Sequence, residues 1–236
     1  LGLGHLELCV IAEELGRFLA PVPFSSSVYL FTEAIINYAN DDVKKEILPK
    51  LVSGEVVGTL AVAEDLQAPN AENISLLSDN NILNGKKIAV PDAEIATHAI
   101  VVAKTSSGIS LQLVKLNAEG IKIEKQENID ESRGYFSILF ENSPSKLIGD
   151  ETGGWDLCEA LMNQAAVLFG YEQIGGSQAA LDMAINYSKE RYAFGRQIGS
   201  FQAIKHKLAD MYIAITLAKS NCYYACLLYT SPSPRD

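Results

Sequence analysis

The chain has 236 residues, and 48% of them are hydrophobic, so it can bury a sizeable core and global disorder is not expected. The formal net charge of −10 argues against nucleic acid or an anionic membrane surface as the main partner, although a few placed cations can still hold an anionic ligand. No apolar run approaches the ~18 residues of a membrane span, and the first residues lack the pattern of a signal peptide.

The cysteines and histidines do not predict a metal site. Four cysteines are too few for a disulfide framework: Cys9, Cys158, Cys222 and Cys226. The last two lie one helical turn apart, but no histidine or second cysteine pair accompanies them, and the three histidines are scattered: His5, His98 and His206. We therefore expect reduced core thiols in a cytoplasmic protein.

Residues 1–57 are expected to form a helical N-terminal domain. The first apolar face combines Leu6, Leu8, Val10, Ile11 and Leu15. A similar pattern covers residues 31–38, and Asn40-Asp41-Asp42 is an N-cap signal for a third helix over 43–51 that breaks near Ser53-Gly54.

Residues 58–149 are expected to form a small antiparallel β-domain, a sandwich or a barrel. Short β-branched runs are separated by turn residues, with strong turn signals at Asn84-Gly85 and Ser106-Ser107-Gly108. The expected strands are 56–62, 74–77, 82–83, 88–90, 99–103, 110–114, 121–124 and 135–140.

Residues 150–226 are expected to form a helical hairpin, which is half of a four-helix bundle. Its helices cover about 155–191 and 200–225. The stretch 227–236 contains Ser-Pro-Ser-Pro, which breaks the pattern abruptly, and it is interpreted as a non-native tail. The fold class is therefore α+β with several domains: a helical domain, a β-domain and a helical hairpin.

The corner of the hairpin carries the densest chemistry. Arg191 can contact a phosphate in a bidentate manner, Phe194 can pack on a ring, and Gln202 can make a directed hydrogen bond. Together they could hold the pyrophosphate and adenine of a dinucleotide. Any one of them alone is more simply interpreted as a solvated residue at the corner between two helices, whereas the whole run favours the dinucleotide.

The chain resembles the acyl-CoA dehydrogenase family over about residues 5–225. The run from Gly175-Gly176 to Met211, with Arg-Tyr-Ala-Phe-Gly-Arg-Gln at 191–197, is the most specific match. Weaker matches are the helical segments 11–16 and 47–55, the segment Leu-Asn-Gly-Lys-Lys at 83–87 and the Asp-x-x-Arg turn at 130–133.

This resemblance implies an FAD-dependent enzyme of fatty acid or lipid catabolism that removes the α-proton of an acyl-CoA while the β-hydrogen leaves as hydride. In the family, the residues matching Arg191, Phe194 and Gln202 contact the FAD of a neighbouring subunit. The implied assembly is a homo- or hetero-oligomer, a dimer or tetramer, with an electron-transfer flavoprotein as a partner. The resemblance also implies that the chain is truncated at the C-terminus and at the N-terminus.

Two departures from the family keep other functions open. Ala63 stands where most members have a threonine that bonds the flavin, and Ala89 and Pro91 occupy the positions of a Trp-x-Thr motif. A non-catalytic partner subunit of a heteromeric dehydrogenase is therefore an alternative, and an acyl-CoA oxidase is a third.

No catalytic base is assigned. Most members place it beyond the second helix of the hairpin, and a minority place a glutamate at the position of Ala165, which cannot serve. Glu172, two turns further along, is a candidate because it lies in an apolar helix. Pairing of Glu172 with a neighbouring cation is the simpler interpretation.

Overall fold

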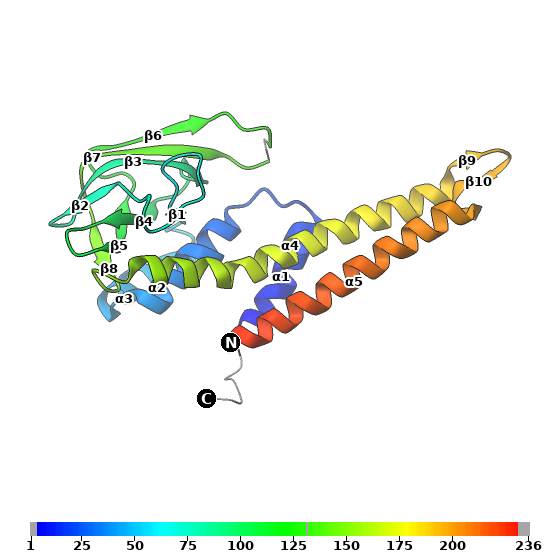
Figure 1. Ribbon diagram of the computed structural model, residues 1–236, viewed down its shortest axis with the longest axis horizontal. Coiled ribbons are helices and arrows are strands. Elements are labelled where there is room, and N and C mark those ends of the chain that lie inside the picture. The colour runs from blue at the N-terminus through cyan, green and yellow to red at the C-terminus, as the bar shows by residue number, and fades with distance from the viewer. Residues whose placement is uncertain (1–3, 131, 231–236) are drawn as a thin grey trace. The chain divides into compact units, whose positions relative to one another are not determined.

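The computed structural model describes residues 4–130 and 132–230, and these fall into two compact units (Figure 1). One unit is Pro21–Asn163, and the other combines the described residues up to Ala20 with those from Gln164 onward. Helices, then a sheet, then helices follow one another along the chain, which confirms the expected fold class. The domain boundaries at 57 and 149 stay a prediction.

Within Pro21–Asn163, three helical segments precede the sheet. They are the π-helical segment Ser25–Thr32, α2 (Glu33–Tyr38) and α3 (Asp41–Ser53). The expected cap is present, because the Asn40 side chain accepts a hydrogen bond of 3.0 Å from the Val43 N–H. Gly54 ends α3 in the left-handed conformation, with φ of 76°, as the Ser53-Gly54 signal predicted.

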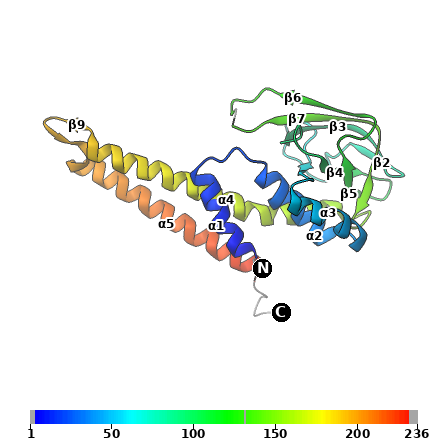
Figure 2. The ribbon, with the colours of Figure 1, turned by 180° about the vertical axis from the view of Figure 1, so that it is seen from behind.

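The sheet has eight strands, and its hydrogen-bonded order is β6-β7-β3-β2-β4-β5-β8, with β1 paired to β4. Figure 2 shows these strands from behind, with α2 and α3 nearby. The strands are β1 (Gly58–Ala61), β2 (Leu77–Asp79), β3 (Ile82–Pro91), β4 (His98–Lys104), β5 (Ile109–Lys115), β6 (Ile121–Gln126), β7 (Tyr135–Pro144) and β8 (Lys146–Ile148).

The sheet is mixed rather than purely antiparallel, which corrects the sequence-based expectation. β4 pairs in parallel with β1, and in parallel with β2 at Leu77 and Lys104. Parallel pairing needs a long crossover connection, and the segment 62–97 between β1 and β4, which includes β2 and β3, is long enough. The remaining pairs are antiparallel.

The prediction of a turn at Asn84-Gly85 is wrong. These residues lie inside β3, where the pairing with β7 shifts register between Leu83 and Asn84. The chain reverses instead at Asn80 and Asn81, whose φ angles of 49° and 62° suit the left-handed positions of a tight hairpin turn. The turn expected at 106–108 is confirmed, because it joins β4 to β5.

The other unit is helical and contains α1 (His5–Arg17), the part of α4 (Gly154–Glu190) from Gln164 onward, and α5 (Gln202–Thr230). α4 and α5 run antiparallel in Figure 1, which confirms the predicted hairpin. α1 crosses α4 at glycines. A Cβ on Gly16 would lie 1.9 Å from the Glu172 carbonyl oxygen, and one on Gly175 would lie 1.8 Å from the Glu13 carbonyl oxygen.

The buried face of α1 differs from the expected one. Cys9, Ala12 and Gly16 are buried, whereas Val10 and Ile11 are exposed. Gly16 faces α4 because the two backbones approach closely there, and Cys9 contacts Cys226 of α5, so the larger side chains of α1 turn away.

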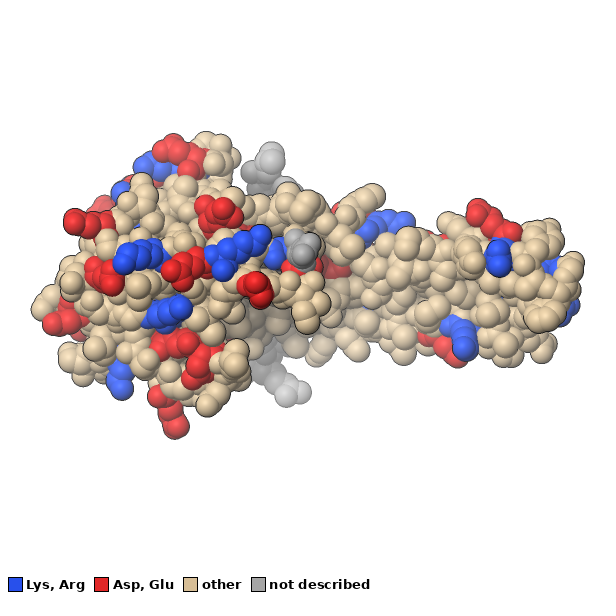
Figure 3. Space-filling model, turned by 90° about the horizontal axis from the view of Figure 1, so that it is seen from above, with Lys and Arg blue, Asp and Glu red and all other residues tan. Residues whose placement is uncertain are grey.

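α5 leaves much apolar surface open, including Tyr212, Ile213 and Leu217. Charged side chains are sparse on the hairpin, at the right of Figure 3. α5 also continues through 227–229 to Thr230 without the break expected there, and residues 231–236, where the rest of the predicted tail falls, lie outside the described residues.

Candidate functional site

The corner of the hairpin is a short β-ribbon. β9 (Tyr192–Ala193) pairs with β10 (Arg196–Gln197), and Phe194 and Gly195 form the turn between them with φ angles of 54° and 76°. Two left-handed residues in a row are typical of the tight turn that joins two antiparallel strands. Glycine adopts this conformation easily, whereas phenylalanine rarely does, so the backbone at Phe194 is strained.

The turn presents the Phe194 side chain to solvent. The side chain is 96% exposed and touches the Phe201 ring edge-on, with ring centroids 6.2 Å apart. The guanidinium of Arg196 lies over the face of Phe201, 4.0 Å from its centroid. Arg196 and Phe201 were missed as site residues, although the alternation of cationic and aromatic residues over 191–201 was a usable signal.

Arg191 and Gln202 flank this ribbon. The Arg191 carbonyl accepts a hydrogen bond of 2.8 Å from Ile198 N–H, which closes the base of the ribbon, and Gln202 is the first residue of α5. Within residues 4–130 and 132–230, no carboxylate pairs with the Arg191 guanidinium, and both side chains are exposed. The structure thus brings Arg191, Phe194 and Gln202 together at one end of the hairpin.

Glu172 lies elsewhere. It sits at the crossing of α1 and α4, half-buried, with its carbonyl against Gly16. It is 19 residues from Arg191, roughly 28 Å at the ~1.5 Å rise of an α-helix. Ala165, where a minority of the resembled family has a glutamate, is fully buried.

The positions that depart from the resembled family are neighbours in the sheet unit. Ile88 N–H donates a 2.8 Å hydrogen bond to the Ala63 carbonyl, which joins the end of β1 to β3. Ala89 is exposed at a bulge with φ of 51°, and its N–H donates to the side chain of Gln126 at 2.7 Å. This region, which we call the Ala63–Ala89 surface, therefore offers backbone groups and an amide, but no hydroxyl at 63 and no aromatic ring at 89.

A buried ion pair lies next to the Ala63–Ala89 surface, and sequence reasoning missed it. Lys87 Nζ is fully buried, 2.7 Å from Glu64 Oε1 and 2.8 Å from the Val62 carbonyl. Glu64 also accepts from the N–H and the hydroxyl of Ser75 and from the Leu76 N–H. Burial raises the pKa of Glu64, but these hydrogen bonds outweigh it and hold the pKa below its usual value.

The pKa of Lys87 is lowered as well, because burial outweighs the attraction of Glu64. The signal for the pair was a lysine on the same face of β3 as the buried Leu83, four residues earlier.

The four cysteines are thiols rather than disulfides, and Cys9, Cys158 and Cys226 are buried. Cys9 Sγ lies 3.5 Å from Cys226 Sγ, and burial with this contact raises the pKa of Cys9 to about 12. Burial raises the pKa of Cys158 to about 11. In the described part of the chain, no group of three or more His, Cys, Asp or Glu is placed to hold a metal, and no helix is both long and apolar enough to cross a membrane.

Comparison with known proteins decides the family. Residues 1–55 match the model of the acyl-CoA dehydrogenase N-terminal domain, and residues 152–231 match that of the acyl-CoA dehydrogenase C-terminal domain. The chain belongs to the acyl-CoA dehydrogenase family. This family accounts for the order of helices, sheet and helical hairpin.

Individual relatives agree with this membership. The mitochondrial 2-methylacyl-CoA dehydrogenase of Solanum tuberosum is 30% identical over 94% of this chain and 58% of its own length. A solved steroid ACAD variant is 28% identical, with a TM-score of 0.84 over 98% of this chain and 63% of that one. A structure described as PigA with FAD and proline shares the fold at 24% identity, with a TM-score of 0.89 over 97% of this chain and 64% of that one. The chain thus spans about three fifths of the length of these proteins.

Proposed function

We propose that the protein is an FAD-dependent acyl-CoA dehydrogenase that oxidises the α,β bond of an acyl-CoA thioester. The ribbon at the end of the hairpin carries this proposal, because it gathers Arg191, Phe194 and Gln202 in one exposed place. Membership of the family and the likeness to the potato enzyme support the reaction class.

The residues at the ribbon fit the pyrophosphate and adenine end of FAD. The Arg191 guanidinium has no carboxylate partner within the described residues, so its donors are available to phosphate oxygens. The strained turn holds the Phe194 ring outward, where it can pack on a ring from another subunit. Gln202, beginning α5, supplies the directed hydrogen bond. We propose that these three contact the FAD of a neighbouring subunit.

The sheet unit would hold the other end of the cofactor through its backbone. The Ala63–Ala89 surface is held in place by the hydrogen bond from Ile88 N–H to the Ala63 carbonyl and by the buried pair of Lys87 with Glu64. FAD, when bound, supplies the acceptor for the hydride that leaves the β-carbon.

The substrate in this proposal is an acyl-CoA, and the α-proton requires a carboxylate base. Glu172 remains the candidate on this chain, although its distance from the ribbon along α4 and its place at the α1 crossing favour a packing role. An electron-transfer flavoprotein is the proposed acceptor of the electrons, rather than the oxygen used by an oxidase. A cytoplasmic location stays a prediction, since the potato relative is mitochondrial.

A non-catalytic partner subunit is the second candidate. The absence of a hydroxyl at Ala63 and of an aromatic ring at Ala89 favours it, because one hydrogen bond and one ring contact are worth roughly 1 kcal/mol each. Such a subunit would lend Arg191, Phe194 and Gln202 to the FAD of an active partner without holding a flavin of its own.

The test is FAD retention by the complete oligomer with Arg191→Ala, compared with Lys207→Ala. Lys207 is an exposed cation on α5 near the same end of the hairpin, so it controls for the loss of a positive charge. A charge-assisted hydrogen bond contributes about 1.5–3 kcal/mol, so Arg191→Ala should weaken FAD binding roughly 10- to 100-fold. Equal FAD affinity in both variants would show that Arg191 is a surface residue.

A further inference from the structure

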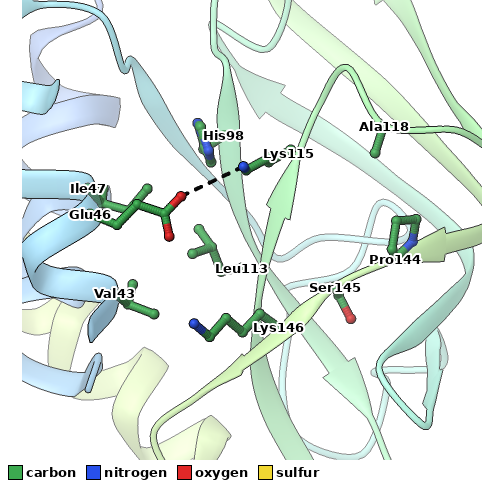
Figure 4. A pocket seen from close by; sticks show the side chains of 10 residues that line it. All are labelled: Val43, Glu46, Ile47, His98, Leu113, Lys115, Ala118, Pro144, Ser145 and Lys146. Carbon is green, nitrogen blue, oxygen red and sulfur yellow. Dashed lines mark ion pairs between the residues drawn. The ribbon is translucent and has the colours of Figure 1, made fainter. Parts of the chain in front are cut away.

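A pocket lies within the unit Pro21–Asn163, between α3 and the strands β4, β5 and β8, and it is called the hollow below. Its volume is about 270 Å³. Figure 4 shows Val43 and Ile47 on α3 at the left, Leu113 and Lys115 on β5, and Lys146 on β8 below them. The side chains that matter here are Val43, Ile47, Leu113, His98, Lys115 and Lys146.

The sequence places these residues together for plain reasons. Asn40 caps α3, and one turn apart on that helix Val43 and Ile47 are each only 2% exposed. In the antiparallel pairing of β4 with β5, His98 and Lys115 are direct partners, so their side chains share a face of the sheet. Leu113, two residues before Lys115, lies on the same face.

His98 is the unusual member of this set, because it is 9% exposed and its Nε2 has no hydrogen-bond partner among the described residues. Nearly all buried polar atoms in proteins have a partner. The other ring nitrogen is satisfied, since Nδ1 lies 2.9 Å from the Thr97 hydroxyl, which in turn lies 3.1 Å from the Val57 carbonyl. The ring is therefore fixed, and its free nitrogen belongs to a residue that lines the hollow.

The charges around the hollow favour an anion. Lys115 and Lys146 supply two cations against the single carboxylate of Glu46. The Lys115 ammonium reaches Glu46 only at 3.7 Å, and both side chains are about half exposed, so this pair leaves donors of Lys115 available. The apolar wall of Val43, Ile47 and Leu113 suits a short hydrocarbon.

We propose that this hollow binds a small aliphatic carboxylate, with its carboxylate on Lys115 and His98 Nε2 and its hydrocarbon against Val43, Ile47 and Leu113. The volume lies just below the ~300–1,000 Å³ of pockets for drug-sized ligands, so a small aliphatic acid fits within it. The site is built by one compact unit and is independent of the FAD proposal.

Binding at this site takes up a proton. Burial and the neighbouring cation Lys115 hold the pKa of His98 below its usual value, with Lys50 acting in the same direction and Glu46 opposing them. A bound carboxylate offsets the charge of Lys115 and accepts from Nε2–H, so it raises the pKa of His98. The protonated ring is satisfied at both nitrogens, because the Thr97 hydroxyl can accept from Nδ1–H while it donates to Val57. Affinity should therefore rise as the pH falls.

The experiment is a titration of the protein with butyrate, followed by NMR of labelled histidine side chains. The chain has three histidines, and His98→Gln assigns the relevant signal. We expect a saturable shift of the His98 signal, stronger at about pH 6 than at about pH 8, either side of the ~6.5 of an ordinary histidine. Butanol, which has the same chain without the charge, should not saturate the site.

Two lysine variants make the matched comparison. Lys115→Met should weaken butyrate binding on the order of tenfold, through the loss of one charge-assisted contact. Lys122→Met should leave it unchanged, because Lys122 is a similarly exposed strand lysine that pairs with Glu141 at 3.0 Å outside the hollow. If Lys115→Met failed to fold, Lys115→Gln would replace it in the comparison.

The proposal would be overturned by the absence of a saturable His98 shift, by equal binding of butanol, or by equal affinity in the Lys115→Met and Lys122→Met variants. Inorganic phosphate binding as tightly as butyrate would also contradict it, since the hydrocarbon wall would then play no part.

Discussion

Replacing Gly175 by alanine should destabilise the helical unit, whereas the same change at its neighbour Gly176 should not. The added Cβ at 175 would lie 1.8 Å from the Glu13 carbonyl oxygen and 2.8 Å from the Arg17 nitrogen, both on the backbone of α1. Carbon–oxygen contacts lie at about 3.3–3.6 Å, so α1 would have to move roughly 1.5 Å. At Gly176 the nearest atom, the Gly16 carbonyl oxygen, lies at 3.4 Å.

The magnitudes separate the two variants. Alanine is better than glycine in a helix by about 1 kcal/mol, and this gain applies to both positions. Forcing extra volume into a packed contact costs about 1–3 kcal/mol, and backbone atoms cannot rotate away, so the upper end applies at Gly175. We expect Gly175→Ala to lower the free energy of unfolding by about 2 kcal/mol and Gly176→Ala to raise it by up to about 1 kcal/mol.

Urea unfolding followed by circular dichroism measures both free energies. Gly16→Ala serves as the reciprocal check, because its Cβ would lie 1.9 Å from the Glu172 carbonyl oxygen on the other side of the same crossing. Equal stability of Gly175→Ala and Gly176→Ala would refute the close crossing of α1 and α4.

Three further predictions concern the sheet unit and the ribbon. Lys87→Met should cost about 3–5 kcal/mol because it leaves the Glu64 carboxylate without its buried partner, whereas Lys122→Met in an exposed pair should cost less than about 1 kcal/mol in the same urea titration. Since the pKa of Glu64 is lowered in the fold, the stability it contributes is present above its usual pKa of 4.5 and is lost as the pH falls through the lowered value; Glu64→Gln should abolish that part of the acid dependence. Phe194→Gly should raise the melting temperature slightly, because it removes about 1 kcal/mol of backbone strain at a left-handed position, yet it should weaken FAD retention. A lower melting temperature would contradict a strained turn.

Local signals predicted the helices and most of the strands. The Asn40 cap and the Gly54 stop define α3 because both act through neighbouring backbone groups. The runs at 99–103 and 110–114 became β4 and β5, since buried strands have a high content of branched residues. The runs at 82–83 and 88–90 became one strand, because a bulge between them interrupts the alternation.

Features set by distant partners could not be predicted in the same way. The buried face of α1 depends on Gly175 of α4, which admits a close backbone approach that the apolar pattern of α1 does not reveal. The hairpin turn lies at Asn80-Asn81 and not at Asn84-Gly85, because Asn84 and Gly85 belong to β3 and pair with β7.

The two candidate sites differ in how far apart their residues lie in the sequence. Arg191, Phe194 and Gln202 are close in sequence, so one motif predicted that they lie together, whereas their roles toward FAD remain proposals. His98 and Lys115 are 17 residues apart and meet only through the pairing of β4 with β5. The scattered histidines of the sequence therefore gave no sign of the hollow.

The most direct test of the central proposal is the visible absorption spectrum of the purified complete protein before and after anaerobic addition of acyl-CoA thioesters. The account predicts bound flavin in stoichiometric amount that is bleached by an acyl-CoA substrate. Protein free of flavin in its native assembly, or flavin unchanged by a range of acyl-CoA thioesters, would contradict it and favour the partner-subunit alternative.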